Sequence, residues 1–361
     1  MAVYDVNGSS LSSAYDVNGL SLASAYDVNG NNVMDSGGGH RDWGTMTDDF
    51  KTSLNSSMNY IQNYIDNHAS AFAFPVFTDV HLFFSWNEPN YIAYHKPDLF
   101  PVFLMLGDMT NLYDVTQLND AVDYMEGATD QTLLVSIGNH EWGNYDTAGT
   151  DPYPKTWYGD LLPASCVFFA DDGLTYYYDD NVNNVRYIML DSNSTVKKQS
   201  GIQQFNLDAL DWLASVLETA ETKDIIVMNH SIGQSFYLVT DTEKTELQSE
   251  TAITNGTTFN RVMNAFKNKT DTYVNVDGVT NTHDFSSTTG NLIGFITGHY
   301  HNAGHIDTAG FNKWTCPALI RNNLTDKGMS FFIVDKDLRT VIFIVARILG
   351  NGEYEVYQYS Y

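Results

Sequence analysis

The chain has 361 residues, of which 43% are hydrophobic, and a formal net charge of −26 at pH 7. This length and composition suit one large or two ordinary globular domains and exclude a wholly disordered chain. The acidic balance argues against surface binding of nucleic acid or anionic lipid, because such binding depends on lysine and arginine. The longest apolar run, at 341–349, is too short to span a bilayer, and no conventional signal peptide is visible.

The first thirty residues contain an internal repeat. The sequence Tyr-Asp-Val-Asn-Gly begins at Tyr4, Tyr15 and Tyr26, a step of eleven residues. Asn-Gly is a strong turn signal, and the neighbouring apolar residues could form very short strands. Such units bury too little surface to be stable alone, so they should stack on each other, on other subunits or on a partner. We therefore predict a β-prone arm with a glycine-rich linker over residues 1–44, whose residues 1–36 serve docking or oligomerisation.

The repeat also resembles part of a calcium loop, which would suit a calcium-dependent adhesion module. Gly38, however, stands where the twelve-residue loop of the third unit needs a glutamate. Docking or oligomerisation is therefore the favoured role.

Residues 45–361 have the pattern of an α/β domain. Apolar residues at helical spacing predict helices over 46–65, 118–125, 205–217 and 259–266. From residue 175 onward short strands outnumber helices, which favours two sheets packed face to face with helices outside. The polar segment 234–258 is expected to form a loop over the site.

Five predicted strands end in residues that can bind metal ions. Because strand ends in α/β proteins deliver side chains into a crevice, we expect these residues to meet. Carboxylates and imidazoles without thiolates suit Mn, Fe or Zn, and there are enough of them for two ions. Two such ions favour hydrolysis of a phosphate ester. The strands cover 74–78, 102–106, 133–137, 225–228 and 292–297, and they lead to Asp79, His81, Asp108, Asn139, His140, His230, His299 and His301.

In order and spacing, these residues resemble the motifs of the calcineurin-like metallophosphoesterases. The resemblance extends from about residue 72 to the C-terminus, and five motifs in sequence are far more specific than any one of them. It implies a single catalytic domain over 45–361, built as two mixed sheets flanked by helices. The motifs are Asp79-x-His81, Gly107-Asp108-x-x-Asn111, Gly138-Asn139-His140-Glu141, Asn229-His230 and Gly298-His299-x-His301.

The resemblance also implies roles for the residues. A hydroxide would bridge two metal ions and attack phosphorus, while His140 would lie beside the phosphate and protonate the leaving group. Asn111 stands where many relatives have an aspartate that bonds the catalytic histidine, so His140 should be less basic or be oriented by another group. The implied ligands are Asp79, His81, Asp108 and His301 for one ion, and Asp108, Asn139, His230 and His299 for the other.

Each residue alone has a structural explanation, because an aspartate can cap a turn and a histidine can lie in a core. Burying the whole set without metal would be very costly. The protein-serine/threonine phosphatase subgroup is disfavoured, because Asp108 is followed by Met109-Thr110-Asn111 and not by Asp-Arg-Gly.

The substrate is expected to be a phosphodiester more readily than a monoester. Only six arginines occur in the chain, and none lies between Arg41 and Arg186, whereas a phosphomonoester dianion usually recruits arginines. The repeat arm, the missing signal peptide and the Tyr-, Asn- and Thr-rich composition resemble phage tail-associated enzymes. This resemblance implies a virion location and a cell-surface polymer such as teichoic acid as substrate. The alternatives are a cytoplasmic location, and a structural or binding tail component with little turnover.

Overall fold

A computed structural model describes residues 3–4, 10–11, 46–81, 87–110, 131–141, 158–169, 174–192, 204–231, 236–238, 246–247, 253–307, 309–319, 328–347 and 353–361. The chain divides into two compact units, Met1–Gly44 and Thr45–Tyr361. In the first unit, β1 (Val3–Tyr4) pairs antiparallel with β2 (Ser10–Leu11). These strands flank the first Asn-Gly pair of the repeat in the sequence.

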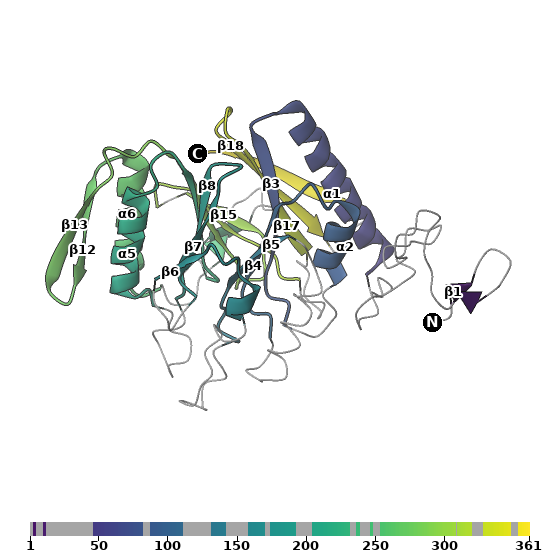
Figure 1. Cartoon of the computed structure of the whole chain (residues 1–361), viewed down its shortest axis with the longest axis horizontal. Coiled ribbons are helices and arrows are strands. Elements are labelled where there is room, and N and C mark those ends of the chain that lie inside the picture. Colours follow the sequence, from purple (N-terminus) through teal and green to yellow (C-terminus); the bar gives the residue numbers. More distant parts are fainter. Residues whose placement is uncertain are drawn as a thin grey trace. The chain divides into compact units, whose positions relative to one another are not determined.

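A six-stranded mixed sheet forms one half of the second unit (Figure 1), in the order β19-β18-β17-β3-β4-β5. The three strands from β3 to β5 are parallel, and the remaining pairs are antiparallel. The strands are β3 (Ala71–Phe77), β4 (Val102–Leu106), β5 (Thr132–Ser136), β17 (Gly328–Asp335), β18 (Thr340–Arg347) and β19 (Tyr354–Ser360).

A nine-stranded mixed sheet forms the other half, in the order β11-β10-β15-β16-β14-β9-β8-β7-β6. Its centre, from β16 to β8, is parallel. The strands are β6 (Val167–Phe168), β7 (Tyr176–Asp180), β8 (Val185–Met189), β9 (Asp224–Met228), β10 (Phe236–Leu238), β11 (Glu246–Leu247), β14 (Leu292–Thr297), β15 (Gly304–Ile306) and β16 (Lys313–Thr315).

The two sheets pack face to face through buried aromatic rings. The ring of Phe74 on β3 meets that of Tyr187 on β8 edge-on at 5.8 Å, and Trp314 on β16 meets Phe332 on β17 at 5.6 Å. Such edge-to-face pairs suit the charge distribution of the rings. The hydroxyl of Tyr176 on β7 also accepts a hydrogen bond from Val135 N–H (2.8 Å) and donates one to Val135 C=O (2.9 Å) on β5.

Helices cover the outer faces of both sheets (Figure 1). The first, α1 (Asp48–Asn67), is capped by the Thr47 side chain and buries Phe50, Leu54 and Ile61 on one face. On the nine-stranded side, α5 (Leu207–Glu218) and α6 (Gly256–Asn268) bury their apolar faces in one core cluster. The other helical segments in the described residues are α2 (Asn87–His95) and the 3₁₀ turn η3 (Gly159–Leu161). No helix in these described segments has the length and apolar character needed to cross a membrane.

The predicted class, two face-to-face mixed sheets flanked by helices, is confirmed. The helices predicted over 46–65, 205–217 and 259–266 correspond to α1, α5 and α6, whereas 118–125 lies outside the described residues. The prediction of a loop over 234–258 is wrong in part, because β10 and β11 lie within it. Their positions are fixed by pairing with distant β15, in the register Tyr237↔His305. The antiparallel hairpin β12 (Asp271–Val276) and β13 (Val279–Asp284) was not predicted either.

The parallel strands of both sheets end at one edge of the sandwich. Backbone hydrogen bonds join the segments that follow them, including Asp79 N–H to Gly107 C=O (3.0 Å) and Gly298 N–H to His230 C=O (2.7 Å). The predicted site residues all follow strands of this kind, namely β3, β4, β5, β9 and β14.

Candidate metal centre

Eight of the nine predicted site residues are described, and the structure brings them together at this edge. Asn111 lies outside the described residues. The remaining side chains form three overlapping groups of potential ligands, and within each group the ligand atoms lie within 4.8 Å of one another. Asn139 joins them, with its Oδ1 3.2 Å from Nε2 of His230. The groups are Asp79, His81 and His301; His81, Asp108 and His140; and Asp108, His230 and His299.

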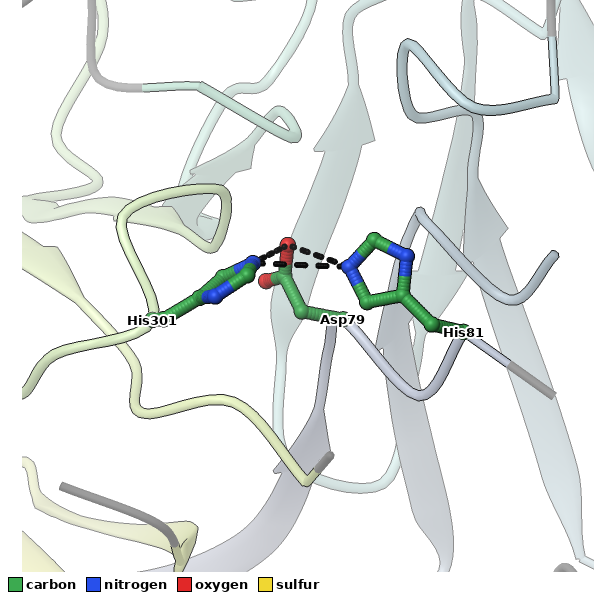
Figure 2. A group of neighbouring side chains, drawn as sticks. All are labelled: Asp79, His81 and His301. Carbon is green, nitrogen blue, oxygen red and sulfur yellow. Dashed lines mark hydrogen bonds and ion pairs between the residues drawn. The ribbon is translucent and has the colours of Figure 1, made fainter. Parts of the chain in front are cut away.

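Asp79 lies at the centre of the first group (Figure 2). Its Oδ1 is 3.2 Å from Nε2 of His301 and 3.9 Å from Nε2 of His81, and the two ring nitrogens are 3.4 Å apart. Oδ1 is buried and has no hydrogen-bond partner in the described part of the chain. An anionic oxygen and two imidazole nitrogens thus converge on one point, an arrangement that suits a metal ion.

The third group, Asp108, His230 and His299, gathers around His230, which is fully buried. Its Nε2 lies 3.1 Å from Oδ2 of Asp108 and 3.2 Å from Nδ1 of His299. Its Nδ1 lies 2.6 Å from the carbonyl oxygen of Leu106. Only a protonated Nδ1 can donate to that carbonyl, so Nε2 is the nitrogen that faces the other ligands.

Asp108 connects the groups. Besides its contact with His230, Oδ2 lies 3.9 Å from Nε2 of His81 and 3.8 Å from Nε2 of His140. The other oxygen, Oδ1, accepts a hydrogen bond from the His140 N–H (2.9 Å). The carboxylate therefore has one oxygen fixed by the backbone and one directed between the imidazoles.

Comparisons with known proteins address the fold. No protein-family model and no curated protein matches the sequence. Among solved structures, PhoD superposes with a TM-score of 0.51 at 10% sequence identity, covering 80% of this chain and 70% of that chain. The chain has the calcineurin-like metallophosphoesterase fold.

Two further structures are similar at lower scores. A purple acid phosphatase from yellow lupin seeds has a TM-score of 0.45 at 10% identity, covering 80% of this chain and 54% of that chain. Vps29 from Chaetomium thermophilum has a TM-score of 0.33 at 13% identity, covering 81% of this chain and 98% of that chain.

The backbone of this metallophosphoesterase fold is unusual at the site. Five of the converging side chains belong to residues with positive φ, between 51° and 70°. Residues other than glycine rarely adopt this left-handed conformation, and each one costs on the order of 1 kcal/mol or more. The surrounding strands hold these residues in the left-handed conformation, which directs their side chains toward one another and strains the local backbone. They are Asp79, His81, Asp108, His299 and His301.

Glycines allow the loops around the candidate metal centre to approach closely. A Cβ on Gly298 would lie 1.8 Å from Oγ1 of Thr78, and a Cβ on Gly138 would lie 2.0 Å from Oδ1 of Asp108. Real Cβ atoms do not approach other atoms so closely. These two motif glycines are therefore required by space, since a side chain at either position would displace Asp108 or Asp79.

Burial and mutual charge set the ionisation of the residues in the candidate metal centre. Burial alone would raise the pKa of Asp79, but the imidazoles of His301, His230 and His81 hold it well below its usual range. Burial would likewise lower the pKa of His230, but Asp108 and Asp79 raise it to about 10. The Asp79 carboxylate is thus anionic at neutral pH. A metal ion would replace the proton that His230 carries on its Nε2.

The sequence did not predict several groups that support the candidate ligands. The hydroxyl of Thr78 donates to Oδ2 of Asp79 (2.6 Å), and so does the backbone N–H of His299 (2.8 Å). Glu141, quoted in a motif but given no role, is fully buried, and burial together with Asp108 raises its pKa to about 7. The only sequence signal for Glu141 was its place directly after His140 at a strand end.

The residues present fit a dinuclear metal centre. The three overlapping Asp and His groups, linked by His81 and Asp108, offer hard oxygens and imidazole nitrogens to more than one ion. The buried Oδ1 of Asp79, with no hydrogen-bond partner among the described residues, fits one of these ions. This donor set is compatible with several divalent and trivalent metals.

Proposed function

We propose that the protein is a metal-dependent phosphoesterase that hydrolyses phosphodiesters in preference to phosphomonoesters. The convergence of two buried aspartates with the histidines of both sheets supports this proposal most directly. When bound, two ions such as Mn, Fe or Zn would hold the phosphate and lower the pKa of water, so that it becomes a nucleophile at neutral pH.

Asp108 is proposed to bind both ions, because its Oδ2 faces His81, which also belongs to the Asp79 group, and His230. The Leu106 carbonyl keeps the ring of His230 in the orientation that such binding needs. Under this proposal one ion is held by Asp79, His81, Asp108 and His301, and the other by Asp108, Asn139, His230 and His299.

His140 is proposed to donate the proton that the leaving alkoxide needs. Its side chain is 34% exposed, whereas those of His81 and His230 are 4% and 0% exposed, so His140 is the more accessible to a substrate. The backbone N–H of His140 is bonded to Asp108, which fixes the residue beside the metal groups. Asn111 is proposed to orient its imidazole.

The preference for a diester rests on charge. Three arginines in the described residues are engaged away from the site: Arg186 pairs with Asp179, Arg261 bonds the carbonyl of Tyr273, and Arg347 pairs with Glu355. A singly charged diester needs less positive charge than a monoester dianion, which usually recruits bidentate arginines.

The test is to purify the protein, measure bound metal, and assay bis(p-nitrophenyl) phosphate beside p-nitrophenyl phosphate with and without added Mn²⁺. We expect metal-dependent turnover that favours the diester. Faster turnover of the monoester would refute the substrate preference. Absence of turnover of either compound, with two metal equivalents bound, would favour the alternative of a structural or binding component.

We further propose that residues 1–36 dock the enzyme onto a particle such as a phage tail, or onto copies of itself, and that the substrate is a cell-surface polymer such as teichoic acid. The pairing of β1 with β2 within the repeat supports a β-structured arm. Detection of the protein in purified virions would support this location. Its recovery only from the cytoplasm of uninfected cells would refute it.

A further inference from the structure

Glu141 carries a buried carboxylate that the proposed chemistry does not use. It follows His140 in the segment after β5, and its side chain reaches back into the segment after β4. Oε2 accepts hydrogen bonds from the backbone N–H groups of Asp108 (2.8 Å) and Gly138 (2.7 Å), and Oε1 accepts one from Thr110 N–H (3.0 Å). One side chain therefore ties together two strand ends of the site.

The connection between the two segments is reciprocal. The Glu141 carboxylate bonds the backbone of Asp108, and the Asp108 carboxylate bonds the backbone of His140. Thr110 adds its hydroxyl, which lies 3.4 Å from Oε1 of Glu141 and 3.2 Å from the His140 carbonyl. These bonds set the separation between the bridging aspartate and the Asn139-His140 pair.

The segments have little room to shift. Gly107, with φ +84°, has a Cβ position only 2.4 Å from the backbone nitrogen of Gly138. Asp108 itself is left-handed, with φ +53°. A strained backbone at this point needs fixed bonds to persist, and the Glu141 carboxylate supplies the bond to the N–H of Asp108.

We propose that Glu141 is the positioning residue of the metal centre: it holds Asp108 at the distance from Asn139 and His140 that two bound ions need. This inference rests on the metal site of the proposed function. It assigns Glu141 no contact with substrate and no proton transfer. Groups that orient metal ligands from behind typically change metal affinity by about tenfold to a hundredfold when they are replaced.

Glu141→Gln is the informative variant. The glutamine amide keeps the size of the side chain but turns an –NH₂ group toward backbone donors, so part of the network must break. Glu141→Asp keeps the carboxylate on a side chain that is one methylene shorter, so the carboxylate reaches less far toward the backbone donors. We expect Co²⁺ titration to show affinity about tenfold to a hundredfold weaker in Glu141→Gln, with an altered Co²⁺ absorption spectrum and an intermediate effect in Glu141→Asp.

Asp180 offers a matched control. It is also buried and accepts hydrogen bonds from two backbone N–H groups, those of Val182 (2.9 Å) and Asn183 (3.1 Å), but in the β7–β8 turn, away from the site. Asp180→Asn should lower the melting temperature and leave Co²⁺ affinity and spectrum unchanged. This separates positioning of the ligands from a general loss of stability.

The outcomes are distinct. Wild-type affinity and spectrum in Glu141→Gln, or an equal loss of affinity in Asp180→Asn, would overturn the inference. If Glu141→Gln does not fold, the Co²⁺ affinity and spectrum of Glu141→Asp provide the same test. A third outcome is that the wild-type protein binds Co²⁺ more tightly than Glu141→Gln does but hydrolyses no phosphate ester. This outcome would refute the proposed function and leave the positioning role of Glu141 intact.

Discussion

Oδ2 of Asp108 lies 3.1 Å from Nε2 of His230, and the two residues belong to different sheets. Asp108 follows β4 of the six-stranded sheet, and His230 follows β9 of the nine-stranded sheet. The candidate metal centre therefore depends on how the sheets pack. A change that separates the sheets should weaken metal binding even if it touches no ligand.

Asp108→Asn should abolish metal binding and hydrolysis together. The amide keeps an oxygen for the His140 N–H but presents no second anionic oxygen to His81 and His230. We expect metal affinity to fall by more than about a hundredfold, the upper range for groups that only support ligands. Metal content after dialysis and turnover of bis(p-nitrophenyl) phosphate measure both effects. Full activity in the variant would contradict the bridging role.

His140→Ala should keep both ions and lose rate. General acid catalysis contributes about 10²-fold to 10⁴-fold, so kcat should fall in that range while metal content stays at the wild-type level. The result also separates two interpretations of the geometry, because His140 lies close enough to His81 and Asp108 to be a ligand itself. Loss of one metal equivalent would identify it as a ligand and not as the acid.

Metal uptake should release protons. In the metal-free protein the pKa of His230 is raised to about 10, so Nε2 is protonated at neutral pH, and an ion must displace that proton. Apparent metal affinity should therefore rise with pH up to about 10. Calorimetric titrations at pH 7.5, in two buffers that differ in ionisation enthalpy, measure the released protons. Identical heats in both buffers would contradict this assignment.

Lys313 should give the stability of the protein a distinct dependence on pH. Its amino group is buried beside Phe311, with Nζ 2.8 Å from Oδ1 of Asn260, and burial lowers its pKa to about 7. Between pH 7 and the ordinary lysine value of 10.5, the unfolded chain binds more protons than the folded protein. The free energy of unfolding should therefore rise with pH across this window.

Lys313→Met should remove that rise and stabilise the protein most at pH 7 and below. Urea unfolding at several pH values measures the effect. Lys267 is exposed, so Lys267→Met serves as a control in which the free energy of unfolding should change with pH as it does in the wild type. Parallel pH profiles for wild type and Lys313→Met would show that the amino group of Lys313 titrates normally.

The sequence predicts the parts of the fold that depend on local patterns. Apolar runs that end in Asp, His or Asn mark β3, β4, β5, β9 and β14, because a buried strand and its polar end are neighbours in the chain. In β12, by contrast, Thr272 and Val274 are buried between exposed neighbours, and the strand is recognisable mainly from its pairing with β13. β10 depends in the same way on distant β15.

The site residues also divide into features that a local sequence pattern predicts and features that depend on distant segments. Residue type and order identify Asp79, His81 and the other candidate ligands, which the structure brings together. The left-handed backbone at Asp79 and the three N–H groups bonded to Glu141 were not predicted. Both arise where loops from separate strands cross, and no spacing within one segment encodes such a crossing.

The bonds between Tyr176 and Val135 have a consequence for the behaviour of the molecule in a crowded solution. Among the described strands, β5 is the outermost of its sheet. An outermost strand with open backbone groups can pair with strands of other molecules. The Tyr176 hydroxyl bonds both the N–H and the C=O of Val135, the fourth of the five residues of β5. We therefore expect Tyr176→Phe to promote aggregation at high concentration, detectable by light scattering, before it affects the candidate metal centre.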